Sequence, residues 1–231
     1  MLEFSLPGGG LWGMTLTGFL YALRERKALP QIISAVSSGN HAGYLAFSDA
    51  DFNKAMAWFR TSGEYLKSKP ITRFLPPYDM KADHISSFTL PFMVDTEVLR
   101  KNGLKHFYVG YIQTKNMKFV AEDVMTYDMY EVFRAILKSS SIPFVTNFVP
   151  HFGGGIDGGF AKNNFHSPLE TRERWMITYG LSNRGPTLDR RIWTRRVILP
   201  RPVGNPLLLN EQHLIENFHR GYDFGATLAG L

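Results

Sequence analysis

The sequence predicts an α/β fold built on a mainly parallel β-sheet, organised as one domain over residues 1–231. Two strand–loop–helix units follow each other at the N-terminus, and apolar strands alternate with helical stretches further along the chain. The first strands carry almost no charge, which is typical of strands buried on both faces of a parallel sheet. A chain of 231 residues is long enough for one such domain with a well-buried core.

The composition is that of a globular protein, with 44% hydrophobic and 20% charged residues. The chain has no cysteine, which excludes disulfides, thiolate nucleophiles and cysteine-based zinc sites. Its net charge of +6 favours anionic partners. Nucleic acid is not predicted to be one of them, because no zinc finger, RNA-recognition motif or basic-helix pattern accompanies the positive charge.

Six arginines are concentrated between Arg184 and Arg201, against the single acid Asp189. One interpretation is a solvated edge hairpin, since charges on an edge strand discourage pairing with other chains. The other is a surface for phospholipid headgroups or an anionic membrane. The sequence leaves both open.

The uncharged stretch from Phe4 to Leu23 does not predict a transmembrane span, because Pro7 and several glycines interrupt it. The N-terminus also lacks the basic residues and the cleavage site of a secretory signal. We therefore expect a cytoplasmic protein or one that binds a membrane peripherally. No feature of the sequence indicates a protein partner.

The first unit consists of a strand from Leu2 to Leu6, a glycine loop from Pro7 to Gly13, and a helix with apolar residues at helical spacing. The loop also matches the dinucleotide pattern G-x-G-x-x-G, but no Asp or Glu lies between Lys27 and Ser48 to hold a ribose. A P-loop is excluded, because no Gly-Lys-Ser/Thr closes the loop. The remaining interpretation is a nest of backbone N–H groups that faces a developing anion.

The second unit places Ser37 at a sharp turn between an apolar strand that begins at Leu29 and a helix rich in small residues. A serine at such a turn has its hydroxyl above the sheet and lies at a helix N-terminus, as in a nucleophile elbow. Ser37 is therefore the candidate nucleophile. The usual G-x-S-x-G pattern is incomplete, because Ala35 replaces its first glycine. Both loops are expected at the carboxyl edge of the sheet, where α/β folds bind ligands.

The stretch from about residue 69 to residue 94 is rich in proline and aromatic residues. Its Pro-Pro pair and spaced aromatics predict an irregular excursion and not a sheet strand. We interpret it either as a packed connection or as a lid or acyl-chain wall beside the serine.

The rest of the chain predicts strands at 105–114, 118–121, 173–181 and 192–199, and helices at 127–138 and 210–228. Asp157 lies between these elements in a run that contains five glycines. A carboxylate in such a run can approach a neighbouring loop without side-chain obstruction, so Asp157 is the candidate base. An ordinary turn aspartate is the alternative, since Asp-Gly commonly marks turns.

Three elements in this order resemble the patatin-like phospholipases: Gly8-Gly9-Gly10-Leu11-Trp12-Gly13, then Val36-Ser37-Ser38-Gly39, then Asp157-Gly158-Gly159. The stretch from Ala135 to Pro143 is similar to that family's helix and Ser-Ile-Pro turn, and Gly221-Tyr222-Asp223 fits its closing helix. The resemblance covers most of the chain. It implies a three-layer α/β/α fold and a Ser-Asp dyad that hydrolyses acyl esters of lipids without a histidine.

The site implied by the resemblance has Ser37 as its nucleophile and Asp157 as its base. Backbone N–H groups of the two loops form its oxyanion hole, namely those of Gly8, Gly9, Gly10 and Ser38. Leu11 and Trp12 of the glycine loop contact the substrate. The resemblance implies no metal and no organic cofactor, a lipid or phospholipid substrate, and peripheral contact with a membrane.

Two departures from the family pattern keep other functions open. Ala35 stands where the family usually has glycine, and Trp12 stands where its glycine loop usually has Arg or Lys. Both are compatible with a lipid-binding or regulatory pseudoenzyme. The same serine is also compatible with acyl transfer to an alcohol or thioester. A Ser-His-Asp triad is a further alternative, with the candidate histidines His41, His151, His166, His213 and His219.

Overall fold

A computed structural model describes residues 1–67, 93–143, 151–180 and 189–230. Within these ranges the centre is a seven-stranded sheet in the order β4-β3-β2-β1-β6-β7, with β5 paired to β3. The strands are β1 (Leu2–Leu6), β2 (Ile32–Val36), β3 (His106–Gln113), β4 (Lys118–Asp123), β5 (Gly155–Asp157), β6 (Glu173–Tyr179) and β7 (Arg195–Leu199). Only β4 and β5 run antiparallel to their described neighbour; the other pairings are parallel. The predicted α/β class with a mainly parallel sheet is confirmed.

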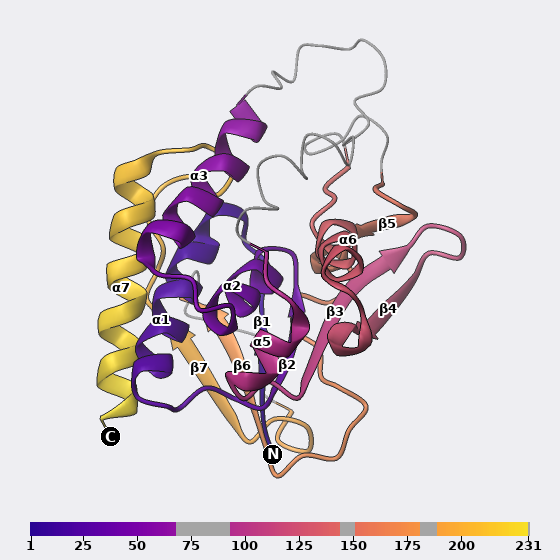
Figure 1. Ribbon diagram of the computed structural model, residues 1–231, viewed down its shortest axis with the longest axis horizontal. Coiled ribbons are helices and arrows are strands. Elements are labelled where there is room, and N and C mark those ends of the chain that lie inside the picture. The colour runs from indigo at the N-terminus through magenta and orange to yellow at the C-terminus, as the bar shows by residue number, and fades with distance from the viewer. Residues whose placement is uncertain (68–92, 144–150, 181–188, 231) are drawn as a thin grey trace.

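Helices flank this sheet, as Figure 1 shows. They are α1 (Gly13–Glu25), α2 (Ser38–Phe47), α3 (Phe52–Lys67), α5 (Thr96–Lys101), α6 (Met129–Ser139) and α7 (Glu211–Ala229). Short 3-10 turns cover Gly10–Trp12, Val124–Thr126 and Gly158–Phe160. α7, drawn in yellow, lies beside α1. The two helices approach closely, since a Cβ on Gly221 would overlap the Thr15 carbonyl oxygen.

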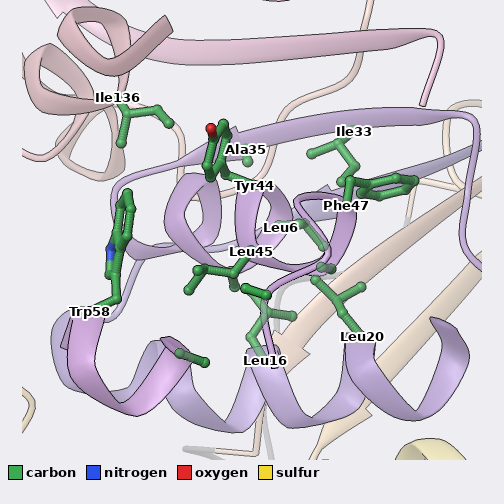
Figure 2. Close-up of a cluster of buried hydrophobic side chains, with 14 of the residues drawn as sticks. Leu6, Leu16, Leu20, Ile33, Ala35, Tyr44, Leu45, Phe47, Trp58 and Ile136 are labelled. Atoms are coloured by element: carbon green, nitrogen blue, oxygen red, sulfur yellow. The ribbon is translucent and has the colours of Figure 1, made fainter. Parts of the chain in front are cut away.

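Alternate residues of the central strands point to opposite faces of the sheet. On one face, Phe4, Leu6, Ile33 and Ala35 join the main hydrophobic core together with side chains of the helices. Figure 2 shows side chains of β2, α1, α2, α3 and α6 meeting in this core. The small, apolar side chain at position 35 is therefore accommodated among the helices.

The opposite face of the sheet is covered, among the described residues, by the segment that follows Asp157. Phe165 of this segment packs with Ile32, Val36 and Tyr108 in a smaller core. The outer layer on this side is thus irregular chain with one 3-10 turn, whereas the α-helices contribute to the main core. This arrangement brings the residues just after Asp157 against β2, the strand that leads to Ser37.

A buried carboxylate lies on this second face. Glu3 is 0% exposed, and its Oε1 accepts hydrogen bonds from Ser34 Oγ at 2.7 Å and from the Ser167 N–H at 2.6 Å. Its Oε2 accepts from Ser167 Oγ and pairs with Arg174 Nε, both at 2.9 Å. This network joins β1 to β2, to β6 and to the segment after Asp157.

Two sequence interpretations need comment. The hairpin interpretation of the arginine-rich stretch is wrong, because β6 and β7 pair in parallel. Arg190 and Arg191 precede the outer strand β7, Arg195 and Arg196 begin it, and Arg201 follows its end, whereas Arg184 lies outside the described residues. The excursion at 69–94, interpreted as a lid or acyl-chain wall, lies outside the described residues except for 93 and 94.

Candidate active site

The strand β3 brings Ser37 and Asp157 together. β2 runs parallel to β3 and ends with Val36 opposite Gly110, whereas β5 runs antiparallel and ends with Asp157 opposite Tyr111. β4 pairs with the other edge of β3 from Tyr108 to Gln113, so β2 and β5 must both lie on the remaining edge. They run in opposite directions along that edge, and their C-terminal ends face each other. Neighbouring residues of a strand are only about 3.3 Å apart. The residue after β2 and the last residue of β5 therefore meet.

Ser37 has the strained backbone of a nucleophile elbow. Its φ of 50° and ψ of −131° fall in a region that side-chain-bearing residues rarely adopt, at a typical cost of about 1 to 3 kcal/mol. The strain is present although Ala35 replaces the usual first glycine. α2 begins at the next residue, Ser38, so the hydroxyl of Ser37 lies at a helix N-terminus. A Cβ on Gly8 would lie 2.8 Å from Ser37 Cβ, which shows how closely the glycine loop approaches the elbow.

Asp157 is buried next to this serine. It is 5% exposed, its Oδ1 accepts a hydrogen bond from the Gly159 N–H at 2.7 Å, and its carboxylate interacts with the Ser37 hydroxyl. Burial raises the pKa of Asp157 to about 6, and the contacts with Ser37 and Gly159 partly oppose this rise. Only glycine fits at position 158, because a Cβ there would lie 2.8 Å from Val36 Cγ1 and overlap the Gly110 carbonyl. A carboxyl group with this pKa is mostly ionised at neutral pH.

The glycine loop presents two of its N–H groups without a partner. In the part of the chain that the structure describes, the N–H groups of Gly9 and Gly10 make no hydrogen bond. The N–H of Gly8, by contrast, donates to Asn163 Oδ1 at 2.8 Å. An oxyanion contact from Gly8 would require this bond to break. The assignment of Gly9, Gly10 and the Ser38 N–H to the oxyanion hole remains a prediction.

The two residues predicted to contact substrate are anchored to the chain after β7. Leu11 is 5% exposed, belongs to the main core, and donates its N–H to the Pro206 carbonyl at 2.8 Å. Trp12 donates its indole N–H to the Gly204 carbonyl at 3.0 Å and its ring contacts Tyr179 edge-on. These contacts hold the glycine loop in place, and they give Leu11 a packing role.

Among the predicted triad histidines, His41 and His166 have hydrogen-bond partners other than Ser37 and Asp157. Trp58 Nε1 donates to His41 Nδ1 at 2.9 Å, so Nε2 carries the proton and donates to Ser140 Oγ at 3.0 Å. Burial lowers the pKa of His41 to about 4, which keeps it neutral. Among the described residues, no histidine is hydrogen-bonded to Ser37 or Asp157.

Three further polar residues, Asn163, Ser139 and Asn40, lie near the site. Asn163 accepts from the Gly8 N–H, and Ser139 Oγ accepts from the Ser37 N–H at 2.9 Å. The Asn40 amide lies 2.8 Å from Ser139 Oγ. The run of three serines at 139–141 is a signal for Ser139, but an asparagine in a helix or loop carries none. Only the fold brings these side chains to Ser37 and Gly8.

By its similarity to solved structures, the chain is an α/β protein with the fold of the patatin-like phospholipases. Among solved structures, the chain is similar to VipD from Legionella pneumophila, with a TM-score of 0.54 and 14% identity over 99% of this chain and 66% of VipD. A second similar structure is the type III effector protein ExoU, with a TM-score of 0.47 and 15% identity over 99% of this chain and 52% of ExoU. The chain thus spans less than two thirds of either protein. No protein-family model and no curated protein matches the sequence.

Proposed function

We propose that the protein is a lipid acyl hydrolase that cleaves carboxylic esters through a Ser37–Asp157 dyad and an acyl-enzyme. The observation that carries this proposal is the buried contact between Asp157 and a serine with a strained, positive φ. Such strain is kept where it serves a site, since the chain would otherwise relax it. The retained strain also favours an enzyme over a pseudoenzyme, despite Ala35. Acyl transfer to an alcohol or thioester uses the same first step.

The proposed reaction proceeds in two halves. Asp157 takes the proton of Ser37 Oγ while Oγ bonds to the ester carbonyl carbon, and the carbonyl oxygen becomes an oxyanion. The N–H groups of Gly9, Gly10 and Ser38 stabilise that charge. The ester bond then breaks, and the leaving alkoxide takes the proton from Asp157. In the second half, water gives a proton to Asp157 and attacks the acyl-Ser37, which releases the carboxylic acid and returns the proton to Ser37.

The test is turnover of a fluorogenic acyl ester by the purified protein and by Ser37→Ala. We expect the native protein to hydrolyse the ester and Ser37→Ala to fall to the background rate, because the attacking oxygen is gone. A fluorophosphonate probe should label the native protein at Ser37 and leave the variant unlabelled. Equal residual rates in the two proteins would exclude the dyad. Product analysis with water and with an alcohol acceptor distinguishes hydrolysis from acyl transfer.

We further propose that the carboxyl edge of the sheet contacts a lipid surface. Across the described residues, no helix is long and apolar enough to cross a bilayer. Exposed apolar side chains nevertheless follow both halves of the site in the sequence: Phe160 is 66% exposed three residues after Asp157, and Leu208 is 63% exposed two residues after Pro206. The Pro206 carbonyl accepts a hydrogen bond from the Leu11 N–H of the glycine loop. Burial of such side chains in a lipid interface is favourable.

Sedimentation with vesicles of phosphatidylcholine and phosphatidylserine tests this contact. We expect the double substitution Phe160→Ser and Leu208→Ser to weaken vesicle binding about tenfold or more, because two apolar side chains no longer leave water. Hydrolysis of a soluble short-chain ester should be unchanged. Tyr130→Ser is the matched control, since Tyr130 is 58% exposed in the first turn of α6, whereas the last turn of that helix contacts Ser37. Equal binding by the double variant and the control would argue against a lipid-facing edge.

A further inference from the structure

The C-terminal turn of α6 contacts both members of the dyad. Ser139 Oγ accepts a hydrogen bond from the Ser37 N–H at 2.9 Å. Two residues later, the Ser141 carbonyl accepts one from the Asp157 N–H, also at 2.9 Å. One short segment thus holds the backbone of the nucleophile and the backbone of the base. Its contacts are suited to fixing the distance between the two side chains.

The Ser139 hydroxyl is placed for this role by its burial and by its other partners. It is 0% exposed and donates to the carbonyl of Gly110, the register partner of Val36 on β3. The Asn40 amide completes the cluster. In the orientation that satisfies both of its ends, Nδ2 donates to the Ala35 carbonyl at 3.0 Å, and Oδ1 lies 2.8 Å from Ser139 Oγ and accepts from the Ser37 N–H at 3.1 Å. The Ser139 hydroxyl proton is thus shared between the Gly110 carbonyl and Asn40 Oδ1, and the Ser37 N–H is shared between Ser139 Oγ and Asn40 Oδ1.

The N–H of Ser37 needs such partners because the elbow is strained. When the shorter of the two hydrogen bonds, that to Ser139 Oγ, is lost, this turn can relax toward an ordinary backbone conformation, and Ser37 Oγ then moves away from Asp157. We propose that Ser139 is a positioning residue. Its hydroxyl links the turn at Ser37 to β3 through hydrogen bonds and thereby fixes the distance between Ser37 Oγ and the Asp157 carboxylate. The proposal rests on the proposed hydrolase function of the dyad.

Ser140 offers a matched control on the same turn. Its hydroxyl donates to the Ile136 carbonyl at 2.9 Å and bonds His41 Nε2 at 3.0 Å, and it makes no hydrogen bond to Ser37 or Asp157. Ser140→Ala and Ser139→Ala delete the same atom from adjacent residues. Each leaves a polar partner in or near the core unsatisfied, so both variants should lose some stability.

The experiment compares kcat, KM and the pH profile of the two variants with those of the native protein. We expect Ser139→Ala to lower kcat by about 10- to 100-fold with KM unchanged, because a small displacement of the nucleophile is costly. The midpoint of its pH profile should stay near the native one, because Ser139 does not touch the Asp157 carboxylate. Ser140→Ala should retain the native kcat. Equal kcat values in the two variants, or a loss confined to KM, would overturn the proposal.

Hydrogen exchange in the native protein provides a second measurement that needs no variant to fold and no turnover. The Ser37 amide should exchange slowly, because it is bonded to a buried acceptor. If the Ser37 amide exchanged at the rate of an unprotected amide, the proposed hydrogen bond to Ser139 would be contradicted. If Ser37→Ala retains full turnover, the proposed function fails; if turnover needs Ser37 but not Ser139, only the positioning role fails.

Discussion

Replacing Asp157 with asparagine is expected to abolish turnover and, at the same time, to stabilise the folded protein at neutral pH. Turnover should fall about 10⁴-fold, the typical loss when the carboxylate of a serine hydrolase is neutralised with little change of shape. The hydrogen bond from the Gly159 N–H can still be accepted by the amide oxygen. Activity assays and urea unfolding of the same samples measure both effects.

The sign of the stability effect follows from the pKa of Asp157, which burial raises from 3.8 to about 6. The folded protein therefore holds this proton more tightly than the unfolded chain. The resulting stability is fully present below about pH 4 and is lost as pH rises through 6. At pH 8 the buried charge thus opposes folding by roughly 2 to 3 kcal/mol. Asp157→Asn removes this charge, so its advantage over the native protein should develop between pH 4 and 6 and remain constant above that range.

The same ionisation predicts the pH dependence of catalysis. The native kcat/KM should rise about tenfold per pH unit below pH 6 and level off above it, because only the carboxylate accepts the Ser37 proton. Ser37→Ala is the control for stability, since it removes the nucleophile but keeps the buried carboxylate. It should therefore retain the pH-dependent loss of stability. A native rate that is flat through pH 6, or an Asp157→Asn variant less stable than native at pH 8, would contradict this assignment.

Glu3→Ala is expected to be the most destabilising single substitution of a charged residue that we consider, at about 3 to 5 kcal/mol in urea unfolding. The glutamate is 0% exposed, and its removal leaves Arg174, itself only 17% exposed, without its counter-charge. It also deprives the Ser34 and Ser167 donors of their acceptor. Because this network lies across β1, β2 and β6, its loss acts on the centre of the sheet.

A surface ion pair of the same length provides the comparison for Glu3. Arg60 Nη2 and Glu211 Oε2 are also 2.9 Å apart, but both side chains are about half exposed. Glu211→Ala should therefore cost less than about 1 kcal/mol. Similar losses for Glu3→Ala and Glu211→Ala would show that the buried network contributes no more than an exposed pair.

The local elements of the site could be predicted because each has a short-range signal. An apolar run that ends at Val36, a serine, and a following stretch of small residues together indicate strand, turn and helix. The glycines around Asp157 likewise indicate a close backbone approach. Such patterns depend on steric and hydrophobic requirements that act within a few residues of each other. They suffice for the α/β class and for Ser37 and Asp157 as candidates.

The contacts between distant segments were not accessible in this way. Glu3 is one charged residue in an apolar strand, and no pattern indicates that Ser167 and Arg174 surround it. The Gly8 N–H, predicted to face an oxyanion, bonds instead to Asn163, which follows it by 155 residues. Such side-chain partners meet only when the segment after Asp157 packs against the second face of the sheet. The sequence carries no periodic signal for them.

By itself the sequence determined the succession of strand, loop and helix in the first two units. It also determined the turn at Ser37 and the close backbone approach at Asp157, since these features depend on local backbone sterics and apolar spacing. Only the tertiary structure decided that Ser37 and Asp157 meet. Their meeting depends on the register of β2 and β5 on β3, where Val36 and Asp157 face the adjacent residues Gly110 and Tyr111. Register is a property of the assembled sheet, because it is set by which side chains the whole core can bury.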